Sequence, residues 1–194
     1  MRMVPLVRLL PFILVLTMGL TGGAASFFQV TINSVSPDPV SVGETVSVDA
    51  TIENTGDVSD TQVVRLYFDD RGSKIDMDDA TVSLAPGETS TITLTGTIPG
   101  VPVGATGLFV ESNDDEDAAG IAVEAGPAEK VVVGTQPTNS TAGQVIEGPP
   151  TAVAVDAGNN PIPNVDVAVT EVGGYPFDEG TTVVTTSSSG TATF

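Results

Sequence analysis

TVSVDATIENTG, residues 45–56, is the stretch of sequence that decides the fold. Every second residue from Val46 to Ile52 is apolar, and polar residues stand between them. A period of two buries one face of a strand and leaves the other in water, so the pattern predicts a strand of a β-sandwich or barrel. The strand should end at Asn54-Thr55-Gly56, where Asn and Gly tolerate the positive φ of a tight turn.

Segments of the same kind lie on both sides of this stretch and are separated by turn signals rich in Pro and Gly. No later stretch has the period of an amphipathic helix. The sequence predicts strands at 27–35, 45–54, 60–70, 79–84, 89–98, 107–112 and 120–125. Seven short strands with turn signals at each break describe an Ig-like Greek-key β-sandwich, and the chain is predicted to be all-β.

The formal net charge of the chain is −19, from 6 Lys and Arg against 25 Asp and Glu. This charge argues against nucleic acid as a partner, because such binding needs cations that neutralise phosphates. It argues equally against docking on an anionic membrane surface. An acidic chain with only two lysines, Lys74 and Lys130, is typical of a high-salt habitat, where salt screens self-repulsion. The alternative is that the acids serve to hold Ca²⁺.

The chain has no Cys, no His and no Trp. Without Cys there is neither disulfide nor thiolate chemistry, and without His the commonest general base and metal ligand is missing. No GxSxG, GxxxxGK[ST] or GxGxxG segment occurs. Paired carboxylates also serve glycoside hydrolysis, but no predicted loop is long enough to wall a cleft. We therefore expect no enzymatic activity within these residues.

Residues 1–25 have the pattern of an export signal. Arg2 and Arg8 form a positive start, an apolar run follows from Leu9 to Leu20, and small residues end the segment. We expect cleavage after Ala25. The apolar run is shorter than the ~20 residues of a spanning helix, so the mature chain should have no membrane span. The protein is thus expected to be secreted or held at the cell surface.

Three motifs follow one another between residues 30 and 125: Ile52-Glu53-Asn54-Thr55-Gly56, Leu84-Ala85-Pro86-Gly87-Glu88 and the acidic turn Glu111–Asp117. In this order they resemble the cell-adhesion-related domain found in bacteria (CARDB), a family that also occurs in archaea. The resemblance implies that residues 27–126 form one Ig-like sandwich of the kind used on cell surfaces.

Residues 127–194 form a second predicted module after the joint Gly126-Pro127-Ala128. Its segments Lys130–Val133, Thr141-Ala142-Gly143, Ala152–Asp156 and Gly158-Asn159-Asn160-Pro161 resemble bacterial Ig-like domains of the invasin/intimin type, as do Val165–Val169 and Ser189–Phe194. That family runs on for further strands beyond the point corresponding to Phe194, so we expect a partial sandwich. A sandwich without its last strands has an unpaired edge, which suggests a strand-donating neighbour as one kind of partner.

The acidic loop is the sharpest candidate site, with Glu111, Asp114, Asp115 and Asp117 as possible Ca²⁺ ligands. The spacing of an EF-hand is not met, because Ala119 takes a ligand position, and a solvated hairpin tip is the competing interpretation. A second acidic set consists of Asp69, Asp70, Asp76, Asp78 and Asp79. No other cofactor is expected.

Asn139-Ser140-Thr141 is an acceptor sequence for N-glycosylation in an exported chain. It makes Asn139 a candidate modification site.

Both resemblances and the signal sequence imply a non-catalytic surface protein whose Ig-like modules act as spacers or adhesive contact elements. Its partner would be a protein or a glycan of the cell surface or the extracellular space. The alternative is a polysaccharide-binding module of a secreted enzyme whose catalytic domain lies outside these residues. Such modules usually present a flat row of aromatics, whereas Tyr67, Phe68, Phe109, Tyr175 and Phe177 are few and scattered.

Overall fold

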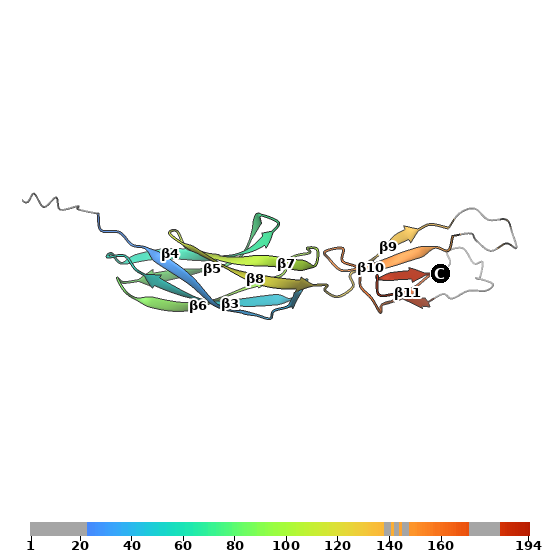
Figure 1. The fold of residues 1–194 in the computed structure, drawn as a ribbon, viewed down its shortest axis with the longest axis horizontal. Coiled ribbons are helices and arrows are strands. Elements are labelled where there is room, and N and C mark those ends of the chain that lie inside the picture. The colour runs from blue at the N-terminus through green and yellow to red at the C-terminus, as the bar shows by residue number, and fades with distance from the viewer. Residues whose placement is uncertain (1–22, 138–140, 142–143, 145–147, 171–182) are drawn as a thin grey trace, which may run out of the picture.

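A computed structural model describes residues 23–137, 141, 144, 148–170 and 183–194. Every regular element in these residues is a β-strand, and they group into two modules that lie end to end (Figure 1). No described segment forms a helix that is long and apolar enough to cross a membrane. The prediction of an all-β chain is therefore confirmed.

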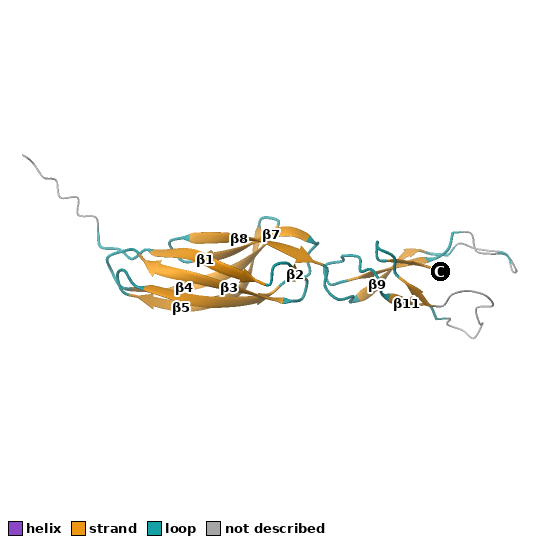
Figure 2. Ribbon diagram, turned by 60° about the horizontal axis from the view of Figure 1, so that its bottom comes forward, coloured by secondary structure: helices purple, strands orange, loops and turns teal. Residues whose placement is uncertain are grey.

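The first module contains eight strands in two facing sheets (Figure 2). The strands are β1 (Phe28–Ser36), β2 (Val40–Ser41), β3 (Thr45–Asn54), β4 (Asp60–Asp70), β5 (Ser73–Leu84), β6 (Thr89–Thr97), β7 (Gly104–Glu111) and β8 (Glu116–Glu124). One sheet has the order β1-β3-β6 and the other β2-β8-β7-β4-β5, with all pairs antiparallel except β2 with β8. This arrangement is the predicted Ig-like sandwich.

The core of this module comes from the alternation that the sequence shows in β3. Val46, Val48, Ala50 and Ile52 are all fully buried, while the residues between them face outward. The facing sheet supplies Val64, Leu66 and Phe68 of β4 and the inward residues of β7 and β8. The period of two thus fixed which face of each strand packs against the other sheet.

The buried side chain of Asn54 connects the two family motifs at one end of the sandwich. Its Nδ2 donates to the carbonyls of Val58 at 2.8 Å and Leu84 at 3.1 Å, and its Oδ1 accepts from Gly56 N at 3.1 Å and Phe27 N at 3.3 Å. The backbone of Asn54 also bonds the Leu84–Glu88 turn, donating to Glu88 O and accepting from Gly87 N. One amide therefore closes the ends of β1, β3 and β5.

Three strands of the first module begin earlier than the sequence predicts, and the short strand β2 is an eighth strand that the sequence analysis does not predict. Among them, β7 begins at Gly104 rather than 107. β5 begins at Ser73 rather than 79, because Arg71 and Gly72, both with positive φ, form a two-residue turn that continues the β4–β5 ladder. β8 begins at Glu116, so the loop before it is shorter than the predicted acidic tip. At the starts of β5 and β8 aspartates occupy strand positions, and a polar run conceals the alternation that marks a strand.

The second module is smaller. Its strands are β9 (Lys130–Thr135), β10 (Thr151–Val155), β11 (Asp166–Ala168), β12 (Val183–Thr185) and β13 (Thr191–Thr193), arranged as a β13-β10-β9 sheet and a β11-β12 sheet. Ala154, Val167 and Ala192 form its buried core. Val131, Val132 and Val133 of β9 are 54, 45 and 62% exposed, so both faces of this edge strand meet solvent in the described structure.

Replacing Asn54 by Ala should destabilise the first module. The change leaves the carbonyls of Val58 and Leu84 without their donor, and a buried polar group without a partner costs about 1–3 kcal/mol, so we expect a loss of about 2–4 kcal/mol in the free energy of unfolding. Urea denaturation of the whole protein measures this. Asn113→Ala is the matched control, because that exposed side chain makes no hydrogen bond within the described residues, and its effect should stay within about 0.5 kcal/mol. Equal effects of the two changes would contradict the role of Asn54.

Candidate functional site

The acidic loop joins β7 to β8 and is closed by its own serine. Ser112 Oγ accepts hydrogen bonds from Asp114 N at 3.2 Å and Asp115 N at 3.0 Å, and Ser112 N donates to Asp115 O at 2.9 Å. The same hydroxyl donates to Phe28 O of β1 at 2.8 Å. The loop is thus an ordered turn that is attached to the facing sheet.

Three carboxylates of this segment bond the backbone of β1, and we name Asp114, Asp115 and Asp117 the carboxylate clamp. Asp114 Oδ2 accepts from Phe28 N at 2.9 Å, Asp115 Oδ2 from Val30 N at 2.9 Å, and Asp117 Oδ2 from Ile32 N at 2.8 Å. Gln62 Nε2 also donates to Asp114 Oδ2, at 2.6 Å. Side-chain oxygens therefore take the place of a neighbouring strand along the edge of β1.

The clamp has a clear physical purpose. β1 is an edge strand of its sheet, and every second N–H of an edge strand points away from the ladder and needs an acceptor. Hydrogen bonds from N–H groups to a carboxylate are shorter and stronger than neutral ones. The clamp satisfies the free edge, ties the two sheets together and removes a template for pairing with another chain.

The same geometry bears on Ca²⁺. Alternate residues of a strand lie about 7 Å apart, so the three clamp carboxylates are spread along β1 rather than turned toward one point. Glu111, the fourth candidate ligand, bonds Lys74 instead. Among the described residues no three acidic side chains are grouped closely enough to hold a metal ion. The Ca²⁺ site stays a prediction, for which these contacts supply no support.

Aspartates also bond other strand edges. Asp78 Oδ2 of β5 accepts from Thr95 N of β6 at 2.8 Å, on the side of the three-stranded sheet opposite to β1. Asp38 Oδ1 accepts from Ala122 N of β8 at 3.0 Å. Within the second acidic set, Asp69 accepts from Gly72 N in the β4–β5 turn, while Asp76 and Asp79 are exposed. These acids therefore do not form a common site.

Lys74 lies over an aromatic pair on the outer face of the larger sheet. Its Nζ is 5.3 Å from the centre of the Tyr67 ring and 5.0 Å from that of Phe109, two residues paired across β4 and β7. It also forms ion pairs with Glu116 and with Glu111, the latter at 2.9 Å, and these two carboxylates raise the pKa of Lys74. Tyr67 and Phe109 are thus neighbours in the described structure, and a cation of the same chain covers both rings.

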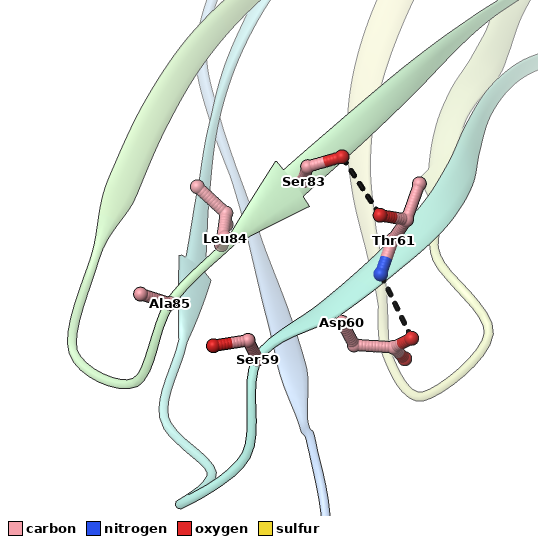
Figure 3. Close-up of a pocket in the computed structure, with 6 residues that line it drawn as sticks. All are labelled: Ser59, Asp60, Thr61, Ser83, Leu84 and Ala85. Carbon is pink, nitrogen blue, oxygen red and sulfur yellow. Dashed lines mark hydrogen bonds between the residues drawn. The ribbon is translucent and has the colours of Figure 1, made fainter.

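A hollow of about 270 Å³ lies between the start of β4 and the end of β5 (Figure 3). Its walls come from Ser59, Asp60, Thr61, Ser83, Leu84 and Ala85. Thr61 Oγ1 and Ser83 Oγ lie 2.7 Å apart, and Thr61 N donates to Asp60 Oδ1 at 2.8 Å. Hydrogen bonds from Ser26, Thr61 and Gln62 lower the pKa of Asp60. These contacts occupy its carboxylate, which bonds neither of the two hydroxyls in the described structure.

The remaining predicted sites lie partly within and partly outside the described residues. Ala25 is described and is held against the turn after β3, where its N donates to Asp57 Oδ1 at 2.7 Å and its O accepts from Asp57 N at 3.0 Å. Its role as the cleavage residue stays a prediction. Asn139, Tyr175 and Phe177 lie outside the described residues, as does most of the predicted signal segment.

Asp115→Ala should weaken the attachment of β1. The buried residue Val30 would lose the acceptor of its N–H, and we expect a cost of about 1–2 kcal/mol in the free energy of unfolding together with faster hydrogen exchange of the Val30 amide. Amide exchange followed by NMR and urea denaturation measure the two effects.

Asp76→Ala is the matched control, because it removes the same charge from an exposed side chain that makes no hydrogen bond in the described structure. It should leave Val30 exchange unchanged. An unchanged Val30 amide in Asp115→Ala would show that the clamp does not hold β1. A melting temperature that rises with added Ca²⁺ in the unaltered protein but not in Asp115→Ala would favour the Ca²⁺ interpretation instead.

Solved structures of other proteins resemble about half of this chain. A β-glucosidase from Listeria innocua in complex with glucose is 24% identical, with a TM-score of 0.43 over 50% of this chain and 16% of that one. β-Glucosidases from Erythrobacter marinus (18%, TM-score 0.44) and Kluyveromyces marxianus (21%, TM-score 0.43) match 51% of this chain and 16% and 14% of theirs. This chain spans about a sixth of the length of these enzymes, and the likeness bears on neither activity nor substrate.

No curated protein matches the chain. The resemblance of the second module to invasin/intimin-type domains stays a prediction. For the first module the sequence-based resemblance is confirmed: residues 28–118 match the CARDB family model.

Proposed function

We propose that this chain is a non-catalytic, exported cell-surface protein whose Ig-like modules serve as a spacer or an adhesive contact element. The observation that carries the proposal is the CARDB match over residues 28–118, since this family is related to cell adhesion. The two modules lie end to end, an arrangement that suits a spacer (Figure 1).

The chemistry of the described side chains supports a role without catalysis. The four acids that the sequence offers as Ca²⁺ ligands accept backbone hydrogen bonds or pair with Lys74, and the carboxylate of Asp60 bonds neither hydroxyl of the hollow beside it. No buried side-chain nitrogen or oxygen in the described part lacks a partner. A catalytic site usually combines such unsatisfied or strongly perturbed groups in a cleft, and the described residues supply no such combination.

Export and surface location follow from the predicted signal segment and stay part of the proposal. Partners of the expected kind are surface proteins or glycans, and the exposed β9 supports the expectation of a strand-donating neighbour.

Antibodies against the purified protein should label intact cells of the source organism. Labelling that is as strong before permeabilisation as after it is the expected result of flow cytometry. An antibody against a cytoplasmic protein of the same cells serves as the control for leakage. Labelling that needs permeabilisation would refute the surface location.

A polysaccharide-binding module is the second candidate, and the paired Tyr67 and Phe109 rings are the observation that favours it. Sugars stack on the open faces of such rings, but here Lys74 lies over both. We therefore expect no retardation of the protein in gels that contain soluble polysaccharide. Lys74→Ala uncovers the rings and provides a sensitive comparison, with Lys130→Ala, a change at the other lysine, as the control. Retardation of the unaltered protein that Tyr67→Ala abolishes would replace the spacer proposal with the polysaccharide one.

A further inference from the structure

The joint between the two modules contains a buried polar network. It is formed by the turn that follows β10, Asp156–Asn160, which we name the docking turn. Asp156 is fully buried and Asn160 is 5% exposed, although both are polar and lie in a loop. Polar side chains are buried in this way only when their hydrogen bonds are satisfied, so the partners define what the turn is built to meet.

Asn160 bonds the first module on two sides of one loop. Its Nδ2 donates to Val101 O at 2.8 Å, and its Oδ1 accepts from Val103 N at 2.9 Å. Val101 and Val103 lie in the β6–β7 connection, at the end of the sandwich that faces the second module. The amide thus pairs with one backbone acceptor and one backbone donor, as a strand neighbour would.

Asp156 holds the linker and the amide in place. Its Oδ2 accepts from Gly126 N and Asn160 Nδ2, both at 2.9 Å, and its Oδ1 accepts from Asn160 N at 2.8 Å. Burial alone would raise the pKa of Asp156, but the hydrogen bonds from Asn160, Gly126 and Gly158 together outweigh it and lower the pKa from its ordinary value. N–H groups of Gly126 and Asn160 therefore satisfy both oxygens of this carboxylate.

The contact is close as well as polar. A Cβ added to Gly158 would lie 2.1 Å from Val101 O, and one added to Gly100 would lie 2.7 Å from Ala157 O. Neither residue has a positive φ that would itself call for glycine. The absence of a side chain at both positions is what allows the loop of one module to approach the turn of the other.

We propose that the docking turn locks the second module onto the end of the first, so that the two modules move as one rigid body. Domains of one chain move relative to each other by default unless a large apolar interface joins them. Here three hydrogen bonds and two close glycine contacts take the place of such an interface. The inference goes beyond the spacer function and does not depend on a surface location, because it concerns the purified protein alone. The proposed lock consists of hydrogen bonds and backbone contacts, so we expect it to form without calcium.

Distances between spin labels test the proposal directly. The chain has no Cys, so Thr81→Cys and Ser188→Cys, both at exposed positions, place one label on each module without a background. Double electron–electron resonance should give a single narrow distribution of the distance between the two spin labels in this protein. The same distribution is expected in excess EDTA, because backbone and amide N–H groups satisfy Asp156.

Two variants should release the joint by different means. Asn160→Ala removes both bonds to the β6–β7 connection, and Gly158→Ala forces Val101 O away without changing any polar group. Each should broaden the distribution, roughly doubling its width as the modules begin to move independently. Asn159→Gly is the control, because that exposed neighbour has φ of 62° and glycine keeps this conformation.

Circular dichroism identifies any variant that does not fold, and the conclusion then rests on the other variant. A broad distribution in the unaltered joint would overturn the proposal. So would a folded Asn160→Ala or Gly158→Ala protein that keeps the narrow distribution. Broadening by EDTA alone would show that a metal ion holds the joint and would overturn the calcium-independent lock.

Discussion

Every backbone N–H and C=O that leaves the ladder of a β-sandwich must find another partner, and the architecture of this chain depends on how that requirement is met. The first module has a three-stranded sheet with two edges and a larger sheet whose hairpins reach those edges. Carboxylates of the larger sheet accept the N–H groups of β1 through Asp115 and its neighbours, and that of Thr95 in β6 through Asp78. Aspartate suits this task because its short side chain accepts strongly and offers no competing donor.

The ends of the sandwich pose the same problem in another form, since loops there have no ladder at all. A buried asparagine meets it at each end. Asn54 gathers the turn after β3 and the Leu84–Glu88 turn at one end, and Asn160 reaches the β6–β7 connection from the second module at the other. An amide donates and accepts without charge through two separate atoms, as a peptide group does, so it can replace a piece of strand where backbone groups of both kinds are unpaired.

Much of the fold follows from the sequence, because alternation in a strand such as Thr45–Asn54 depends only on which face is buried. The contacts of the acidic loop do not follow in this way. Asp114 and Phe28 are 86 residues apart, and no local rule states that one will accept a hydrogen bond from the other. The early part of β5 and the start of β8 were missed for a related reason, since Asp76, Asp78 and Asp117 stand in strands where local preference favours a turn. Asn54 and Asn160 both lie in segments that the sequence analysis quotes, but only the structure shows that each bonds backbone groups far away in the sequence.

The acidic composition has to be interpreted with these contacts in mind. A net charge of −19 can indicate a surface adapted to high salt or a set of acidic side chains that bind calcium. Both interpretations assume that the acidic side chains are free to face solvent or ions. In this chain a share of the acids accepts backbone hydrogen bonds instead, at the edge of β1 through the clamp and at the joint through Asp156. Such acids are tied to the fold rather than to the medium, so their number says nothing about salt or calcium. Only the exposed acids without backbone partners, such as Asp76 and Asp79, bear on the choice between those two interpretations.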